Sequence, residues 1–101
     1  MTFTKVGTAE DFLSDRLAEL RVSGKEILVG EVNGRFSALG NVCTHAGCRL
    51  SGGRIRGGQI RCPCHGSAFD PVTGKVLAGP AERPLPVYHI KVENGQIWVD
   101  A

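Results

Sequence analysis

Six of the seven Cys and His residues of this chain lie in one short window. The chain holds four Cys and three His, and only His89 lies outside residues 43–65. Cys43 and His45 form one mixed pair of ligands, and Cys62 and His65 form a second after sixteen intervening residues. Because thiolate and imidazole groups bind both zinc and iron–sulfur clusters, the window predicts a metal site.

The spacing within the first pair bears on which metal the site holds. One zinc ion could accept all four side chains tetrahedrally, but structural zinc ligands are usually separated by two to four residues, and Cys43 and His45 have one residue between them. A two-iron cluster could instead take both cysteines on one iron and both histidines on the other. The ligand count alone leaves both possibilities open.

Length, charge and hydropathy limit the classes of protein. With 101 residues, 42% of them hydrophobic, we expect a single domain over residues 1–101. A net charge of +2 is far from the basic excess of a nucleic-acid binder, so no nucleic-acid partner is expected. The chain has neither a signal-peptide pattern nor an apolar run of about 18 residues, so we expect a cytoplasmic protein that does not contact a membrane.

Turn signals predict an all-β fold in which two loops carry the ligands. Ser23-Gly24, Asn33-Gly34, Gly57-Gly58 and Asn94-Gly95 separate extended segments, as expected of hairpins with positive φ angles in their turns. The hairpin over residues 54–61 has the ligand segments 43–52 and 62–69 on either side of it. We therefore expect these two segments to be neighbouring loops.

Three further segments have local signals of their own. Thr8 and Asp11 resemble a capping box that opens one short N-terminal helix, through about Ser14. Residues 70–74 have the Pro and Gly of a turn. Residues 78–86 contain three prolines, which predict an extended segment outside the sheets.

The two ligand segments, Cys43-Thr44-His45-Ala46-Gly47-Cys48 and Cys62-Pro63-Cys64-His65-Gly66-Ser67, resemble the two boxes of Rieske 2Fe-2S proteins. The resemblance implies a Rieske-like fold of stacked antiparallel sheets, in the family three of them, with a cluster-binding subdomain at about residues 40–77. It implies one 2Fe-2S cluster as the cofactor. Cys43 and Cys62 would bind one iron, and His45 and His65 the other.

Charge counting sets the electron affinity expected of such a site. Two ferric ions, two sulfides and two thiolates give a neutral oxidised cluster, whereas four thiolates would give a dianion, so the His ligands raise the reduction potential. By resemblance, the Ser67 hydroxyl donates a hydrogen bond to a bridging sulfide, which favours reduction. Phe69 stands where high-potential respiratory members carry a Tyr that donates to a ligating cysteine. Since Phe cannot donate, we expect an intermediate potential.

The remaining cysteines, Cys48 and Cys64, match the family's disulfide between the two cluster loops; the alternative is two buried thiols. A disulfide that closes the fifteen residues between Cys48 and Cys64 would stabilise an unconstrained chain by about 3 kcal/mol. It would stabilise the protein much less where a cluster already holds the two loops together. Cytosolic cysteines normally stay reduced, so a disulfide in that compartment would be plausible if it were buried between the loops.

The ligand supply argues against catalysis by this chain alone. With His45 and His65 on the cluster, only His89 remains, too few for the two His of a mononuclear oxygenase iron. The chain also lacks the glycine fingerprint of a dinucleotide site. Resemblance to stand-alone Rieske ferredoxins implies a soluble one-electron carrier between a flavin-dependent reductase and a terminal oxygenase, which dock transiently at the cluster tip. The terminal oxygenase expected from this resemblance is a ring-hydroxylating one. The alternatives are a small Rieske redox subunit of another complex, as the disulfide of cytochrome bc-type subunits would indicate, or a zinc-stabilised interaction module.

Positive charge is concentrated around the ligands. Residues 43–75 carry five basic residues and one acidic residue, while the whole chain has a net charge of +2. This asymmetry could steer an acidic partner to the cluster end. Alternatively, Arg54, Arg56 and Arg61 could simply face water on alternating strand positions.

Overall fold

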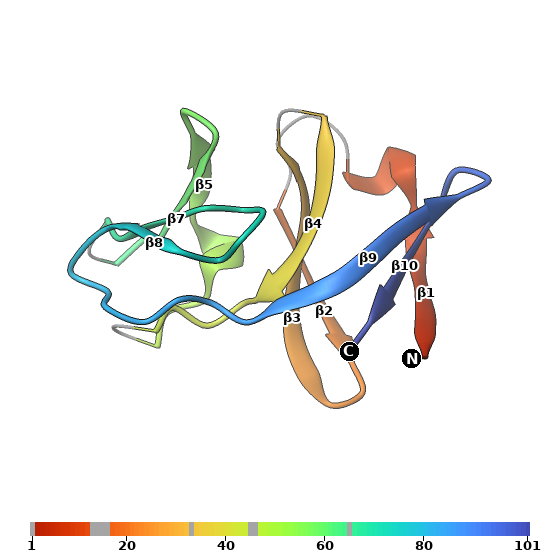
Figure 1. Cartoon of the computed structure of the whole chain (residues 1–101), viewed down its shortest axis with the longest axis horizontal. Helices are drawn as coiled ribbons and strands as arrows, with labels where there is room; N and C mark the ends of the chain where they lie inside the picture. The colour runs from red at the N-terminus through yellow and green to blue at the C-terminus, as the bar shows by residue number, and fades with distance from the viewer. Residues whose placement is uncertain (1, 13–16, 33, 45–46, 65) are drawn as a thin grey trace.

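The protein is built from two antiparallel sheets (Figure 1), seen in a computed structural model that describes residues 2–12, 17–32, 34–44, 47–64 and 66–101. The six-stranded sheet has the order β1-β10-β9-β4-β3-β2, and the four-stranded sheet has the order β5-β6-β7-β8. The strands are β1 (Phe3–Thr8), β2 (Leu17–Val22), β3 (Lys25–Val32), β4 (Arg35–Gly40), β5 (Arg54–Arg56), β6 (Gln59–Arg61), β7 (Ala68–Phe69), β8 (Val76–Ala78), β9 (Val87–Glu93) and β10 (Gln96–Asp100). The all-β prediction is confirmed.

The six-stranded sheet consists of two three-stranded halves. Within the sheet they are joined between β4 and β9, where Ala38 pairs with Tyr88 and Leu39 with Val87. Figure 1 shows β9 and β10 turning away from β3 and β4, while the four-stranded sheet lies on the opposite side of β3 and β4. The chain thus has three layers, as the Rieske resemblance implied.

The central layer is buried on both of its faces, which explains the continuous apolar run Ile27-Leu28-Val29. Ile27 and Val29 pack in a large-sheet core between the two halves, whose buried members are Phe12, Val22, Ile27, Val29, Ala38, Ile97 and Val99. Leu28 points the other way, because successive strand residues face opposite sides. It joins a ligand-side core under the four-stranded sheet, whose buried members are Leu28, Leu39, Cys43, Leu50, Ile60, Cys62, Phe69, Ala81 and Leu85.

The hairpin turns lie where the sequence placed them. Positive φ angles occur at the dipeptides 23–24, 57–58 and 94–95, as primed turns require, and at Gly34, whereas Asn33 lies outside the described residues. The turn predicted at 70–74 is also present. In it, the Asp70 carboxylate accepts hydrogen bonds from the N–H groups of Val72 and Thr73, at 2.7 and 3.1 Å.

The structure differs from the sequence predictions in three places. The N-terminal helix is a single 3-10 turn over Ala9–Phe12, with the Thr8 N–H donating to Asp11 at 2.9 Å; the part expected through Ser14 lies outside the described residues. Strands β1 and β7 were not predicted, because β1 lacks a turn signal before it and β7 is only two residues long. The alternation of apolar residues in the terminal hairpin, Ile90 and Val92 on one strand and Ile97 and Val99 on the other, predicts that all four face inward; Val92 is instead 46% exposed, because β4 and β9 have separated before that position.

Among the described residues, no helix has the length and apolar character needed to cross a membrane. The single domain over residues 1–101, with a cluster-binding subdomain at about 40–77, stays a prediction.

Candidate metal centre

Two loops with matching backbone hydrogen bonds carry the predicted ligands. In loop 1 (residues 43–48), the Cys43 N–H donates to the Cys48 carbonyl at 2.8 Å, and the Gly47 N–H donates to the Cys43 carbonyl at 3.0 Å. In loop 2 (residues 62–67), Cys62 donates to Ser67 at 2.8 Å, and Gly66 donates to Cys62 at 3.2 Å. Each loop is therefore a closed turn that begins at a predicted ligand.

Each loop contains a glycine at a position where the backbone has a positive φ angle. Gly47 and Gly66 occupy equivalent positions and have φ angles of 71° and 76°. This left-handed conformation is accessible to glycine at little cost and strained for most other residues. The two sequence boxes share this glycine because both loops close with the same backbone geometry.

Both predicted cysteine ligands are buried in the same apolar surroundings. Cys43 is 2% exposed and Cys62 is 4% exposed, and both belong to the ligand-side core. That core also contains Phe69, which is fully buried. The fold thus brings together two thiol groups that lie far apart in the chain. His45 and His65, the other two predicted ligands, lie outside the described residues.

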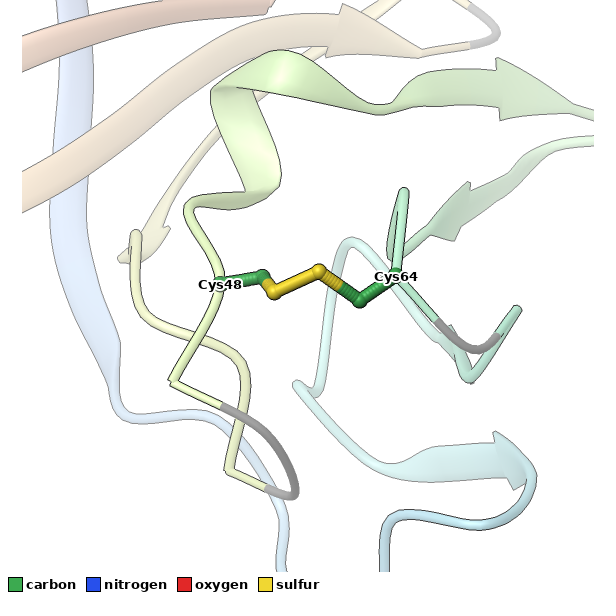
Figure 2. The surroundings of a disulfide bond; sticks show 2 residues. All are labelled: Cys48 and Cys64. Carbon is green, nitrogen blue, oxygen red and sulfur yellow. A yellow bond between two sulfur atoms is a disulfide. The ribbon is translucent and has the colours of Figure 1, made fainter.

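A disulfide links the two loops. Figure 2 shows the bond between Cys48 of loop 1 and Cys64 of loop 2, whose Cα atoms are 6.4 Å apart. The pairing implied by the resemblance is present, rather than two buried thiols. The disulfide is not buried between the loops, as protection from cytosolic reductants would require, because Cys64 is exposed and Cys48 is only half-buried.

The Ser67 side chain is held by the segment that follows β8. Ser67 is fully buried, and its Oγ accepts a hydrogen bond from the Ala81 N–H at 3.0 Å. Because a hydroxyl group has one hydrogen to donate and two lone pairs, this contact leaves its hydrogen available for another acceptor. The same segment also contacts loop 1, since the Thr44 hydroxyl donates to the Arg83 carbonyl at 2.6 Å.

A polar network that the sequence analysis missed fixes the base of loop 1 to the large sheet. Asn41 is fully buried; its Oδ1 accepts from the Ser51 N–H at 2.8 Å, and its Nδ2 donates to the Ser51 hydroxyl at 3.1 Å. Beside it, Arg49 donates to one oxygen of Glu26 through Nη2 at 2.9 Å and Nε at 3.1 Å. Hydrogen bonding from Arg49 is the main cause that lowers the pKa of Glu26 below its ordinary value. These contacts join segments that are distant in the sequence. The only sign of them in the sequence is that the residues involved are polar.

Comparison with known proteins identifies the family. The Rieske [2Fe-2S] domain matches residues 2–89, which include both loops. The chain belongs to the Rieske [2Fe-2S] domain family. It therefore carries a Rieske 2Fe-2S cluster and acts as an electron carrier, not as the catalytic enzyme.

Similar Rieske proteins include ferredoxin components of dioxygenase systems. The ferredoxin component of the naphthalene 1,2-dioxygenase system of Pseudomonas putida is 38% identical over 90 residues, covering 89% of this chain and 86% of that protein. The solved ferredoxin of carbazole 1,9a-dioxygenase from Nocardioides aromaticivorans has a TM-score of 0.92 and 29% identity, with 98% and 97% of the two chains covered. A chain from a complex of reduced oxygenase and oxidized ferredoxin in carbazole 1,9a-dioxygenase has a TM-score of 0.89 and 34% identity, with 96% and 91% covered.

The described side chains fit a Rieske cluster. Two buried thiols on adjoining closed loops supply the soft donors that iron–sulfur clusters require. The Ser67 hydroxyl, with its hydrogen available, adds a polar group of the kind that tunes such centres. Membership of the Rieske family therefore favours an iron–sulfur cluster over a zinc ion, two possibilities that the number of ligands alone left open.

Proposed function

We propose that this chain carries single electrons from a flavin-dependent reductase to the terminal oxygenase of a ring-hydroxylating dioxygenase system. The proposal is supported by the similarity to the ferredoxin components of naphthalene and carbazole dioxygenase systems, which extends over nearly the whole chain. The observation that carries it is the pair of matching loops, which places Cys43 and Cys62 in one core and joins the loops through a disulfide.

In this proposal Cys43 and Cys62 bind one iron, and His45 and His65 bind the other. The support is the position of each residue in its sequence box, together with the burial of both cysteines. When bound, a Rieske cluster accepts and releases one electron. Two neutral imidazoles in place of two thiolates make the oxidised site less negative, so reduction costs less electrostatic energy.

The remaining residues of the site tune and protect it. Ser67 donates its hydroxyl hydrogen toward the cluster, oriented by the Ala81 N–H that binds the same oxygen. Phe69 packs in the ligand-side core and has no hydrogen to donate. These two features together support a potential in the middle of the family range of about −150 to +300 mV.

We also propose that the protein works in the cytoplasm, as expected of a partner for a soluble reductase and oxygenase. Because Cys64 is exposed, cytosolic reductants can reach the disulfide, and its oxidation state in cells then follows their reduction potential. Trapping thiols with an alkylating reagent during lysis, followed by mass spectrometry, reports that state directly.

The test begins with the purified protein reduced by dithionite. A Rieske cluster with mixed ligands gives a rhombic electron paramagnetic resonance signal, and a zinc protein gives none. Cys43→Ser should abolish the signal, whereas the matched change Cys48→Ser in the same loop should keep it. Electron delivery is then measured with the reductase and oxygenase of the naphthalene 1,2-dioxygenase system. A chain that holds the cluster but transfers no electron to that oxygenase, or to a carbazole dioxygenase, would contradict the proposal.

A further inference from the structure

Three arginines share one face of the β5–β6 hairpin. Arg54 pairs directly with Arg61 across the two strands, and Arg56 lies two positions from Arg54. Residues two apart on a strand, and residues directly opposite each other, point to the same side of the sheet. The other face carries the pair Ile55 and Ile60, of which Ile60 is buried in the ligand-side core. The three arginines therefore lie on the face opposite to that core.

This face borders a cleft of about 410 Å³ beside loop 2. Arg54, Arg56 and Arg61 line it together with Cys62 and Pro63, and its other lining residues are glycines 52, 53 and 66. None of the described residues that line the cleft is acidic. A Cβ atom on Gly53 would collide with the Arg61 carbonyl oxygen, so only glycine lets the chain pass this close to the hairpin.

The charge in the cleft is not neutralised by the described part of the chain. Among the described residues, the ion pairs are those of Arg49 with Glu26 and of Lys91 with Glu93, and neither involves the cleft. None of the three cleft arginines is therefore paired with a described carboxylate. The Nε atom of Arg61 is buried and has no hydrogen-bond partner among the described residues. Like charges directly opposite on neighbouring strands destabilise a sheet, so the Arg54–Arg61 pair is unfavourable for folding alone.

We propose that this arginine cleft binds carboxylates on the surface of an electron-transfer partner and so orients that partner against loop 2. The inference rests on the proposed electron-carrier function. Arginine is suited to the role because its planar guanidinium group binds carboxylates through two hydrogen bonds. Arg54 and Arg56 are exposed. One carboxylate pairs with one guanidinium group through two hydrogen bonds, so several carboxylates are needed to neutralise the three cations. An acidic protein surface supplies several carboxylates together.

The position of the cleft gives the docking a purpose. Cys62, a proposed iron ligand, lines the cleft, so a partner bound there contacts the wall of the cluster site rather than a remote surface. Net positive charge over residues 43–75 would also speed the encounter with an acidic partner at low ionic strength. The side of the hairpin, and not only the tip of the two loops, then determines how the partner approaches.

The test compares charge-neutralising variants with a matched control. The variants Arg54→Gln, Arg56→Gln and their combination each remove charge from the cleft. The control Lys5→Gln removes one charge from an exposed position on β1, which lies in the half of the large sheet that is farther from the hairpin (Figure 1). Each holoprotein is first checked by its electron paramagnetic resonance signal. Electron-transfer rates with the naphthalene dioxygenase reductase and with the oxygenase are then measured by stopped flow at increasing NaCl concentration.

The double variant should transfer electrons with at least one partner about 10-fold more slowly at low salt, and this difference should disappear at high salt. Lys5→Gln should stay close to wild type. Arg54→Gln should keep or raise the thermal midpoint, since it removes the like-charge pair. If Arg54→Gln lowers the midpoint, the arginine serves the fold and the inference is wrong.

Two other outcomes separate the possible failures. A double variant equal to wild type with both partners at every salt concentration overturns the docking inference while leaving the electron-carrier function intact. Wild-type protein that neither accepts electrons from the reductase nor delivers them to the oxygenase overturns the proposed function itself.

Discussion

Removing the Ser67 hydroxyl should lower the reduction potential and weaken the fold at the same time. In Ser67→Ala, the buried Ala81 N–H loses the oxygen that accepts its hydrogen bond at 3.0 Å. Leaving a buried donor unsatisfied costs about 1–3 kcal/mol of folding free energy. The variant also loses the hydroxyl hydrogen that, by resemblance to the family, Ser67 donates to a bridging sulfide.

The shift in potential can be estimated from the change in cluster charge. Hydrogen bonds to charged groups are about 1–2 kcal/mol stronger than hydrogen bonds between neutral groups, and the cluster gains one negative charge on reduction. Since about 1.4 kcal/mol corresponds to about 59 mV for one electron, the midpoint of Ser67→Ala should fall by about 40–80 mV. Protein-film voltammetry at fixed pH measures this shift directly.

The control for this experiment is Ser37→Ala. Ser37 is also buried, at 8% exposure, but lies on β4 of the large sheet. It should leave the midpoint unchanged. A Ser67→Ala protein with an intact electron paramagnetic resonance signal and a midpoint within about 10 mV of wild type would refute the assigned role of the hydroxyl, because such a shift corresponds to only about 0.2 kcal/mol.

Three more changes probe other contacts of the site. Phe69→Tyr should raise the midpoint by about 20–60 mV if its new hydroxyl donates to a ligating sulfur, as one hydrogen bond of about 0.5–1.5 kcal/mol allows; an unchanged or lower midpoint in voltammetry contradicts this. Replacing Cys48 and Cys64 together by Ser should destabilise the cluster-free protein by about 3 kcal/mol and the cluster-bound protein by much less; equal losses in thermal unfolding of the two forms would show that the cluster does not tie the loops. Glu26→Gln should lower the thermal midpoint at pH 7, and the difference from wild type should shrink as the pH falls below the ordinary Glu value of 4.5 and through the lowered pKa, because the ion pair with Arg49 is then lost. A difference that stays constant with pH would assign the effect to packing.

The sequence was sufficient to predict the fold wherever turn chemistry is local. Asn94-Gly95 and Gly57-Gly58 mark hairpins because their backbone angles are restricted whatever the rest of the chain does. Strand β7, by contrast, is two residues long and forms only because β6 and β8 lie on either side of it. The exposure of Val92 likewise depends on where β4 and β9 separate, which no local pattern encodes.

The same division applies to the metal centre. The paired boxes indicated the disulfide through their resemblance to a known family, and the structure contains it. The exposure of Cys64 could not be predicted, because it depends on how the two loops pack against each other. The support of Ser67 by Ala81 and of Asn41 by Ser51 depends on contacts between segments at least ten residues apart. Residue type alone predicts neither partner.

The burial of Cys43 and Cys62 also affects the speed of electron transfer. Both lie in a close-packed core with Leu39, Leu50 and Phe69, all of which are at most 1% exposed. Such packing resists displacement, and it would keep water dipoles away from a cluster held by these two thiolates. On the proposed ligand assignment, few protein atoms around the two cysteines would need to move when the charge of the site changes by one unit. The cysteine side of the site would therefore contribute little to the reorganisation energy of electron transfer.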